Sequence, residues 1–68
     1  MNERYTLAKA TLDDTVFPAV HDHEAETVTT FFREDSARRA LAEYRDGTAG
    51  GYIPLPVSMF NTVEEVAE

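Results

Sequence analysis

Apolar residues recur along the chain at two different spacings, and the change of spacing separates predicted strands from a predicted helix. Residues 4–12 are compatible with both patterns. In a strand, Leu7 and Thr11 would share one face. In a helix, Ala8 and Leu12 would share one side. We favour a strand for this segment.

A turn and a second strand are predicted next. Asp13 and Asp14 mark the turn, because short acidic side chains tolerate tight turns of the backbone. Residues 15–21 are rich in the β-branched and aromatic side chains that suit a pleated, half-buried surface. Pro18 has no backbone N–H to donate, so we expect this strand to lie at a sheet edge.

Residues 26–33 have the strongest strand composition in the chain. Alternation along a strand places Val28, Thr30 and Phe32 on one face. Phe31 then points to the other face, which is either partly covered or exposes the ring. An exposed Phe31 is a candidate contact residue for a partner.

A helix is predicted from Ser36 to about Asp46. Its apolar stripe has the spacing i, i+3, i+4, i+7 and consists of Ala37, Ala40, Leu41 and Tyr44. Asp35 or Ser36 is expected to accept hydrogen bonds from the free amides of the first turn. Gly47 is expected to adopt the left-handed conformation that closes the last turn.

Two prolines shape the chain that follows the helix. Pro54 and Pro56 exclude a helix from residues 52–57, which we expect to be extended and to lie at a sheet edge. Asn61 is followed three residues later by Glu64, a variant of the capping box that opens many helices. We therefore predict a short C-terminal helix.

The order of these elements predicts an α+β fold, in which a small antiparallel sheet of three to four strands packs against one central α-helix. A chain of 68 residues has room for one domain, and we assign residues 1–68 to it. A core of this size gives modest stability, so association with another copy or with a partner would help the fold.

Charge narrows the classes of partner. The chain has 13 Asp and Glu residues against six Lys and Arg, a formal net charge of −7, which repels nucleic acid and anionic lipid. The chain has no cysteine, which fits a reducing compartment. No apolar run has the length of a signal-peptide core or a membrane span. We expect a cytoplasmic protein without direct contact to nucleic acid or membrane.

The acidic residues are concentrated in one segment. Residues 13–26 contain no Lys or Arg, and their five acids are Asp13, Asp14, Asp22, Glu24 and Glu26. If Asp22, Glu24 and Glu26 occupy one strand, their side chains project to the same side and form a regular line of anions. Such a line suits a basic groove on a protein partner, and complementary charge would steer the encounter.

Motifs for catalysis are missing from the sequence. Ser36 and Ser58 lack the flanking glycines of a nucleophile elbow, and no lysine follows the glycines near position 50 as in a phosphate-binding loop. Adjacent carboxylates such as Glu64 and Glu65 look like a solvated helix face. We predict that the protein is not an enzyme, and we assign no catalytic residue, cofactor or resident metal.

One segment has side chains with ligand chemistry. It combines imidazoles and carboxylates, namely His21, Asp22, His23, Glu24 and Glu26. In an extended chain His21 and His23 would project to the same side. A complete metal site needs ligands from elsewhere, so a metal-binding hairpin at His21 and His23 is the third functional hypothesis.

In its length, its acidic segment from Asp13 to Glu26, its lack of cysteine and its lack of catalytic motifs, the chain resembles the small acidic inhibitors of phages and mobile elements. Anti-CRISPR proteins belong to that group, and the resemblance is one of general character. It implies a non-catalytic inhibitor that occludes a basic, nucleic-acid-binding surface of an effector complex. The partner-binding candidates are Asp13, Asp14, Asp22, Glu24, Glu26 and Phe31.

The alternative is a small structural or regulatory adaptor. It would act as a monomer or homodimer and bind through an apolar sheet edge. The candidate residues for that edge are Phe31, Tyr52, Ile53 and Leu55.

Overall fold

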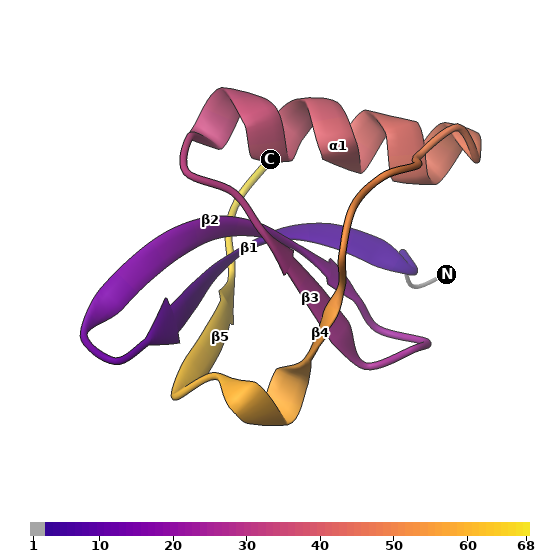
Figure 1. Ribbon diagram of the computed structural model, residues 1–68. Coiled ribbons are helices and arrows are strands. Elements are labelled where there is room, and N and C mark those ends of the chain that lie inside the picture. Colours follow the sequence, from indigo (N-terminus) through magenta and orange to yellow (C-terminus); the bar gives the residue numbers. More distant parts are fainter. Residues whose placement is uncertain (1–2) are drawn as a thin grey trace.

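The computed structural model describes residues 3–68 and has an α+β fold, as the sequence predicts (Figure 1). Five strands form one antiparallel sheet in the order β4-β3-β2-β1-β5, which is more than the three to four predicted. The elements are β1 (Tyr5–Leu12), β2 (Thr15–Asp22), β3 (Thr27–Thr30), α1 (Glu34–Asp46), β4 (Leu55–Pro56), the 3-10 helix η1 (Val57–Met59) and β5 (Thr62–Glu65). Helix α1 covers one face of the sheet, and the segment containing η1 passes beneath the other.

The segment that was compatible with strand or helix is strand β1, paired with β2 through a two-residue turn. Asp13 and Asp14 form this turn with φ angles of 47° and 66°. Two consecutive positive φ angles are the requirement of a type I′ hairpin turn, and aspartate is among the few side chains that adopt them at low cost. The predicted turn is confirmed.

Pro18 lies in an interior strand, which corrects the expectation that its strand is at a sheet edge. β3 pairs only with residues 19–22 of β2, so Pro18 lies just beyond that ladder. The Phe31 N–H donates to the Pro18 carbonyl at 2.8 Å. Because the nitrogen and carbonyl of one strand residue point to the same side, the Pro18 nitrogen faces away from β1. Its missing N–H therefore costs β1 no hydrogen bond.

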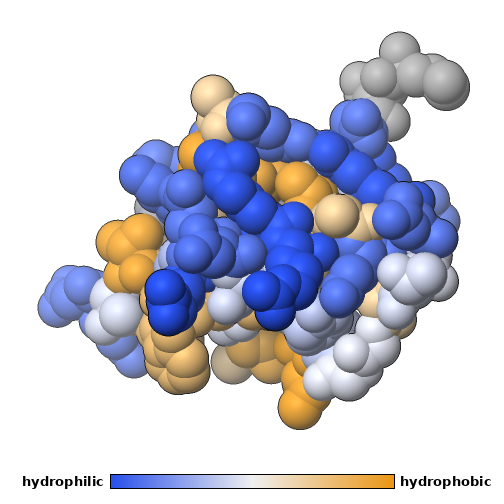
Figure 2. Space-filling view, turned by 90° about the horizontal axis from the view of Figure 1, so that it is seen from above, coloured by the Kyte–Doolittle hydropathy of each residue, from blue (hydrophilic) through white to orange (hydrophobic). Residues whose placement is uncertain are grey.

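Helix α1 confirms the predicted amphipathic helix but begins at Glu34, two residues earlier than predicted. Its N-cap is Arg33 without a side-chain hydrogen bond, so neither Asp35 nor Ser36 caps it. Gly47 closes the helix in the left-handed conformation, with φ 76°. The surface seen from above α1 is mostly hydrophilic (Figure 2). Within residues 3–68, no helix has the length and apolar character needed to cross a membrane.

The predicted C-terminal helix is wrong, because Thr62–Glu65 form strand β5 against the outer edge of β1. Asn61 caps no helix, and its side-chain oxygen instead accepts the Asp13 backbone N–H at 2.9 Å. Thr62 and Val63 are β-branched residues, which suit a strand. The unpaired backbone of β1 offers partners along this whole segment, and that pairing outweighs a local capping signal.

The apolar core has one part on each face of the sheet. Under α1 the buried residues are Leu7, Val20, Ala37, Ala40 and Leu41. On the opposite face they are Ala10, Ala19, Val28 and Phe60. The edge position predicted for residues 52–57 is confirmed for Leu55–Pro56, which form the two-residue edge strand β4, but the 3-10 helix η1 already begins at Val57, so the exclusion of helix holds only up to Pro56. The chain therefore covers both faces of the sheet, the second one only with the segment that leads into β5.

Candidate metal centre

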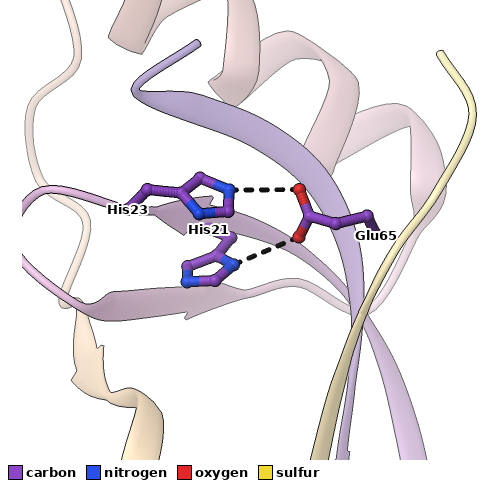
Figure 3. A group of neighbouring side chains, drawn as sticks. All are labelled: His21, His23 and Glu65. Atoms are coloured by element: carbon purple, nitrogen blue, oxygen red, sulfur yellow. Dashed lines mark hydrogen bonds and ion pairs between the residues drawn. The ribbon is translucent and has the colours of Figure 1, made fainter. Parts of the chain in front are cut away.

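His21, His23 and Glu65 converge on the sheet face opposite α1 (Figure 3). The two imidazole rings lie one above the other and both present a nitrogen to the carboxylate of Glu65. His21 belongs to β2, His23 follows in the turn to β3, and Glu65 is the last residue of β5. Two segments more than 40 residues apart in sequence thus build one cluster.

The register of the sheet explains why these side chains share a face. His21 lies opposite Thr6 in β1, and Glu65 lies opposite Ala8 on the other side of that strand. Thr6 and Ala8 are two residues apart, so they and their partners point to the same face. The His23 N–H donates to the Arg4 carbonyl at 2.8 Å, which continues the extended pairing beyond β2. His23 therefore stays on the same side as His21, as predicted.

The donor atoms lie close enough together for a single ion. His21 Nδ1 is 3.1 Å from one Glu65 carboxylate oxygen, and His23 Nε2 is 3.1 Å from the other. The ring centroids are 3.8 Å apart, and all three potential ligand atoms lie within 4.8 Å of one another. Atoms bound at about 2.0–2.2 Å to one tetrahedral or octahedral ion are separated by roughly 3.0–3.5 Å. The two nitrogen–oxygen separations of 3.1 Å fall within that range.

Thr6 orients the carboxylate. Its hydroxyl donates to Glu65 Oε1 and also lies 2.8 Å from His23 Nε2. Partial burial raises the pKa of the Glu65 carboxyl, but the hydrogen bonds from Thr6, His21 and His23 outweigh burial and lower the pKa below its ordinary value. Glu65 is consequently an anion at neutral pH, the form that binds metal.

The cluster is open to solvent on one side. The His21 side chain is 16% exposed, whereas those of His23 and Glu65 are 40% and 49% exposed. A hollow of about 340 Å³ adjoins them and is lined by Glu3, Thr6, His23 and Glu65. Three protein ligands beside an open space leave at least one coordination position for water or an external ligand.

The acidic residues predicted to bind a partner do not form one line. β2 ends at Asp22, and Glu24 and Glu26 lie in the turn that follows, so the premise of a continuous strand is wrong. Asp13 and Asp14 occupy the turn at the other end of β2, an eight-residue strand that spans roughly 24 Å. The five carboxylates therefore lie at the two opposite ends of β2, two in the turn before it and three at its last residue and in the turn after it.

Asp22 is also paired. Both of its oxygens bind the Arg4 guanidinium, at 3.0 and 3.2 Å, and Glu24 lies 3.8 Å from the same group. Asp22 Oδ1 accepts the backbone N–H groups of Glu24 and Ala25 as well. Partial burial raises the pKa of Asp22, but these hydrogen bonds outweigh it and hold the pKa below its ordinary value. The Asp22 carboxylate therefore stabilises the turn that contains His23.

We expect Asp22→Ala to lower the free energy of unfolding by about 1 kcal/mol at pH 6, because two turn amides lose their acceptor. A lowered pKa means that the folded protein binds this proton less tightly than the unfolded chain, so the stabilisation is present above pH 4. It is lost as the pH falls from about 4 through the lowered pKa. Urea unfolding at pH 6 and pH 3 measures this, with the exposed Glu24→Ala as control. An equal loss at both pH values would contradict the assignment.

The exposed aromatic ring is not the one predicted. Phe31 is half-buried, packs against the core beneath α1 and meets the Tyr52 ring edge-on at 5.4 Å. β3 ends at Thr30, so the strict alternation assumed for residues 26–33 stops before either phenylalanine. Phe32 is 93% exposed instead.

Sequence reasoning missed Thr6 and Glu65 as members of a site. Glu65 was assigned to a solvated helix face, and that error followed from the wrong helix. The signal was the alternation of Thr62, Val63 and Glu64, which suits a strand and would have placed Glu65 on the face of Val63. Only the pairing of β5 with β1 brings that face next to the histidines.

Comparison with protein-family models, with curated proteins and with solved structures finds no match to this chain.

Proposed function

We propose that the protein is a small metal-binding domain, in which His21, His23 and Glu65 hold a divalent transition-metal ion. The observation that carries this proposal is the convergence of two imidazoles and an ionised carboxylate from β2, its following turn and β5. His21 and His23 are ligand candidates already from the sequence, and Glu65 is the third ligand. The proposal revises the expectation of a protein without a resident metal.

The donor set selects the class of ion. Imidazole nitrogen suits Zn²⁺, Ni²⁺, Co²⁺ and Cu²⁺, whereas Mg²⁺ and Ca²⁺ prefer sites built from oxygen alone. The half-exposed ligands permit exchange with solvent. We therefore propose an ion of the zinc type, with water in the open position.

The ion also has a structural role in this proposal. β5 pairs only with β1, through four residues, three of them exposed. An ion bound by His21, His23 and Glu65 links β5 to β2 across the intervening strand. Since the ligands converge only in the folded chain, metal binding adds directly to the stability of the fold.

Titration of the protein with Co²⁺ and Zn²⁺ tests the site. We expect one equivalent of Co²⁺ to give a visible absorption spectrum that Zn²⁺ then displaces. Glu65→Gln should weaken Zn²⁺ binding by more than about 100-fold, since loss even of an outer partner of a ligand costs 10- to 100-fold. Isothermal titration calorimetry measures the affinity.

Glu64→Gln is the matched control, because it removes the same charge from the neighbouring residue. Glu64 lies opposite Lys9 and points to the other face of the sheet. The Glu64→Gln variant should therefore bind Zn²⁺ with the affinity of the unaltered protein. If both substitutions weakened Zn²⁺ binding equally, the affinity would depend on net charge alone and not on the cluster. If the unaltered protein did not bind Zn²⁺, the proposal would be wrong.

The hypothesis of an acidic inhibitor stays a prediction. The net charge of −7 supports attraction to a basic protein partner. The pairing of Asp22 with Arg4 and the separation of the two acidic turns weaken the support from a regular line of anions. A partner would meet isolated acidic turns, at Asp13 and Asp14 or at Glu24 and Glu26.

A further inference from the structure

We propose that an apolar hollow between the start of α1 and the sheet binds a small organic acid, whose apolar body fills the hollow and whose carboxylate pairs with Lys9. This inference does not depend on metal binding, because the hollow lies on the sheet face that carries α1 and the cluster lies on the other face. It rests on the apolar lining of the hollow, its volume and the charges at its rim.

The hollow lies where α1 stops covering the sheet. Its apolar lining consists of Leu7, Ala8, Val16, Pro18 and Val66. Leu7 and Val66 also belong to the core beneath α1, which places the hollow on that face. α1 begins only at Glu34, at the rim, and Val16 beyond it is 56% exposed. A ligand in the hollow would therefore bury apolar surface that the helix leaves in contact with water.

The volume of the hollow limits the size of the ligand. It measures about 220 Å³. An apolar cavity of about 150 Å³ binds benzene, whereas pockets for drug-sized molecules measure about 300–1,000 Å³. The hollow thus has room for one phenyl ring or a short branched chain.

Two charged residues line the hollow, and they differ in their pairing. Glu34 lies 3.2 Å from Arg38, one turn further along α1, so its charge is offset within the helix. Lys9, the chain's only lysine, forms no ion pair within 4 Å among residues 3–68. Its apolar stem can line the hollow while the ammonium stays in water at the rim. A seated ligand therefore meets one positive charge that is available for pairing.

Charge complementarity selects an acid with a single negative charge. A neutral molecule would leave Lys9 without a partner, and an amine would be repelled by it. A dianion would be opposed by the net charge of −7 and by Glu64, which lies opposite Lys9 on the same face. One carboxylate on an apolar body balances the ammonium and matches the lining.

An NMR titration of the ¹⁵N-labelled protein tests the site, with benzoate as the probe and benzyl alcohol as its neutral counterpart, at low salt to limit screening. We expect benzoate to shift the amide signals of Leu7, Lys9 and Val16 and to bind more tightly than benzyl alcohol. Lys9→Met should weaken benzoate binding by about 5- to 10-fold and leave benzyl alcohol binding unchanged, since only the carboxylate pairs with the ammonium. Lys9→Arg should restore benzoate binding.

The matched control for net charge is Arg39→Met, because Arg39 is exposed on α1 and does not line the hollow. This variant should bind benzoate like the unaltered protein. Val16→Trp should fill the hollow and abolish binding of both probes, and Glu64→Gln should strengthen benzoate binding by about 2- to 5-fold. Circular dichroism checks that each variant is folded.

Four results would overturn the proposal. They are the absence of shifts around the hollow, equal affinity for the two probes, benzoate binding that Lys9→Met leaves unchanged, and equal weakening by Lys9→Met and Arg39→Met. Signals of these amides that move with protein concentration alone would identify a second copy as the occupant, and this would overturn it as well.

Discussion

Replacing Phe60 with alanine should unfold the protein or bring it close to unfolding. Among residues 3–68, Phe60 is the large aromatic side chain that is buried in the core on the sheet face opposite α1. It packs there with Ala10 and Ala19, whose small side chains leave space for the ring, and with Val28. Removing a buried phenylalanine costs about 3–5 kcal/mol, whereas a chain of 68 residues has a total stability of roughly 3–10 kcal/mol.

Urea unfolding followed by circular dichroism measures this loss, with Met59→Ala as the control at an adjacent, 49% exposed position. Phe60→Leu keeps part of the apolar volume and should stay folded with a smaller loss. Because Phe60 directly precedes the segment that carries Glu65, Phe60→Leu should also reduce the affinity for Zn²⁺. Equal unfolding midpoints for Phe60→Ala and Met59→Ala would contradict the role given to the ring.

Elements whose signals are local could be predicted from the sequence. The apolar stripe of α1 and its closing glycine, Gly47, depend on residues within one helix, and the turn at Asp13 and Asp14 depends on two residues. The start of α1 was harder, because the chain uses Arg33 without a side-chain cap while better capping residues follow it. Preference for a cap is worth about 1 kcal/mol, which tertiary contacts readily outweigh.

Elements that depend on distant pairing could not be predicted. Pro18 suggested an edge strand, but the short β3 leaves the proline beyond its ladder even though β2 lies inside the sheet. β5 forms because the backbone of β1 is free to pair on that side, and no local sequence pattern near residues 62–65 indicates this pairing. The same limit applies to the cluster, since the spacing of His21 and His23 is visible in the sequence but the approach of Glu65 is not.

Metal binding should raise the stability of the whole domain and of β5 in particular. An ion that binds only the folded state stabilises it by about 2.7 kcal/mol when its free concentration is 100 times Kd. For a domain of this size, each kcal/mol shifts Tm by roughly 4–8 °C, so the expected rise in Tm is about 10–20 °C. Few substitutions in a chain this small would match the effect.

Thermal unfolding with and without Zn²⁺ measures the rise in Tm, and a chelator should reverse it. Hydrogen exchange shows which segment the ion stabilises. The Val66 N–H donates to the Leu7 carbonyl at 3.0 Å, and it should exchange more slowly once the ion fixes β5. Lower pH should diminish the shift, since protons compete with the ion for imidazole nitrogen. Glu64→Gln should show the full shift and Glu65→Gln almost none. Equal shifts in these two variants would mean that Zn²⁺ stabilises the protein from a different place.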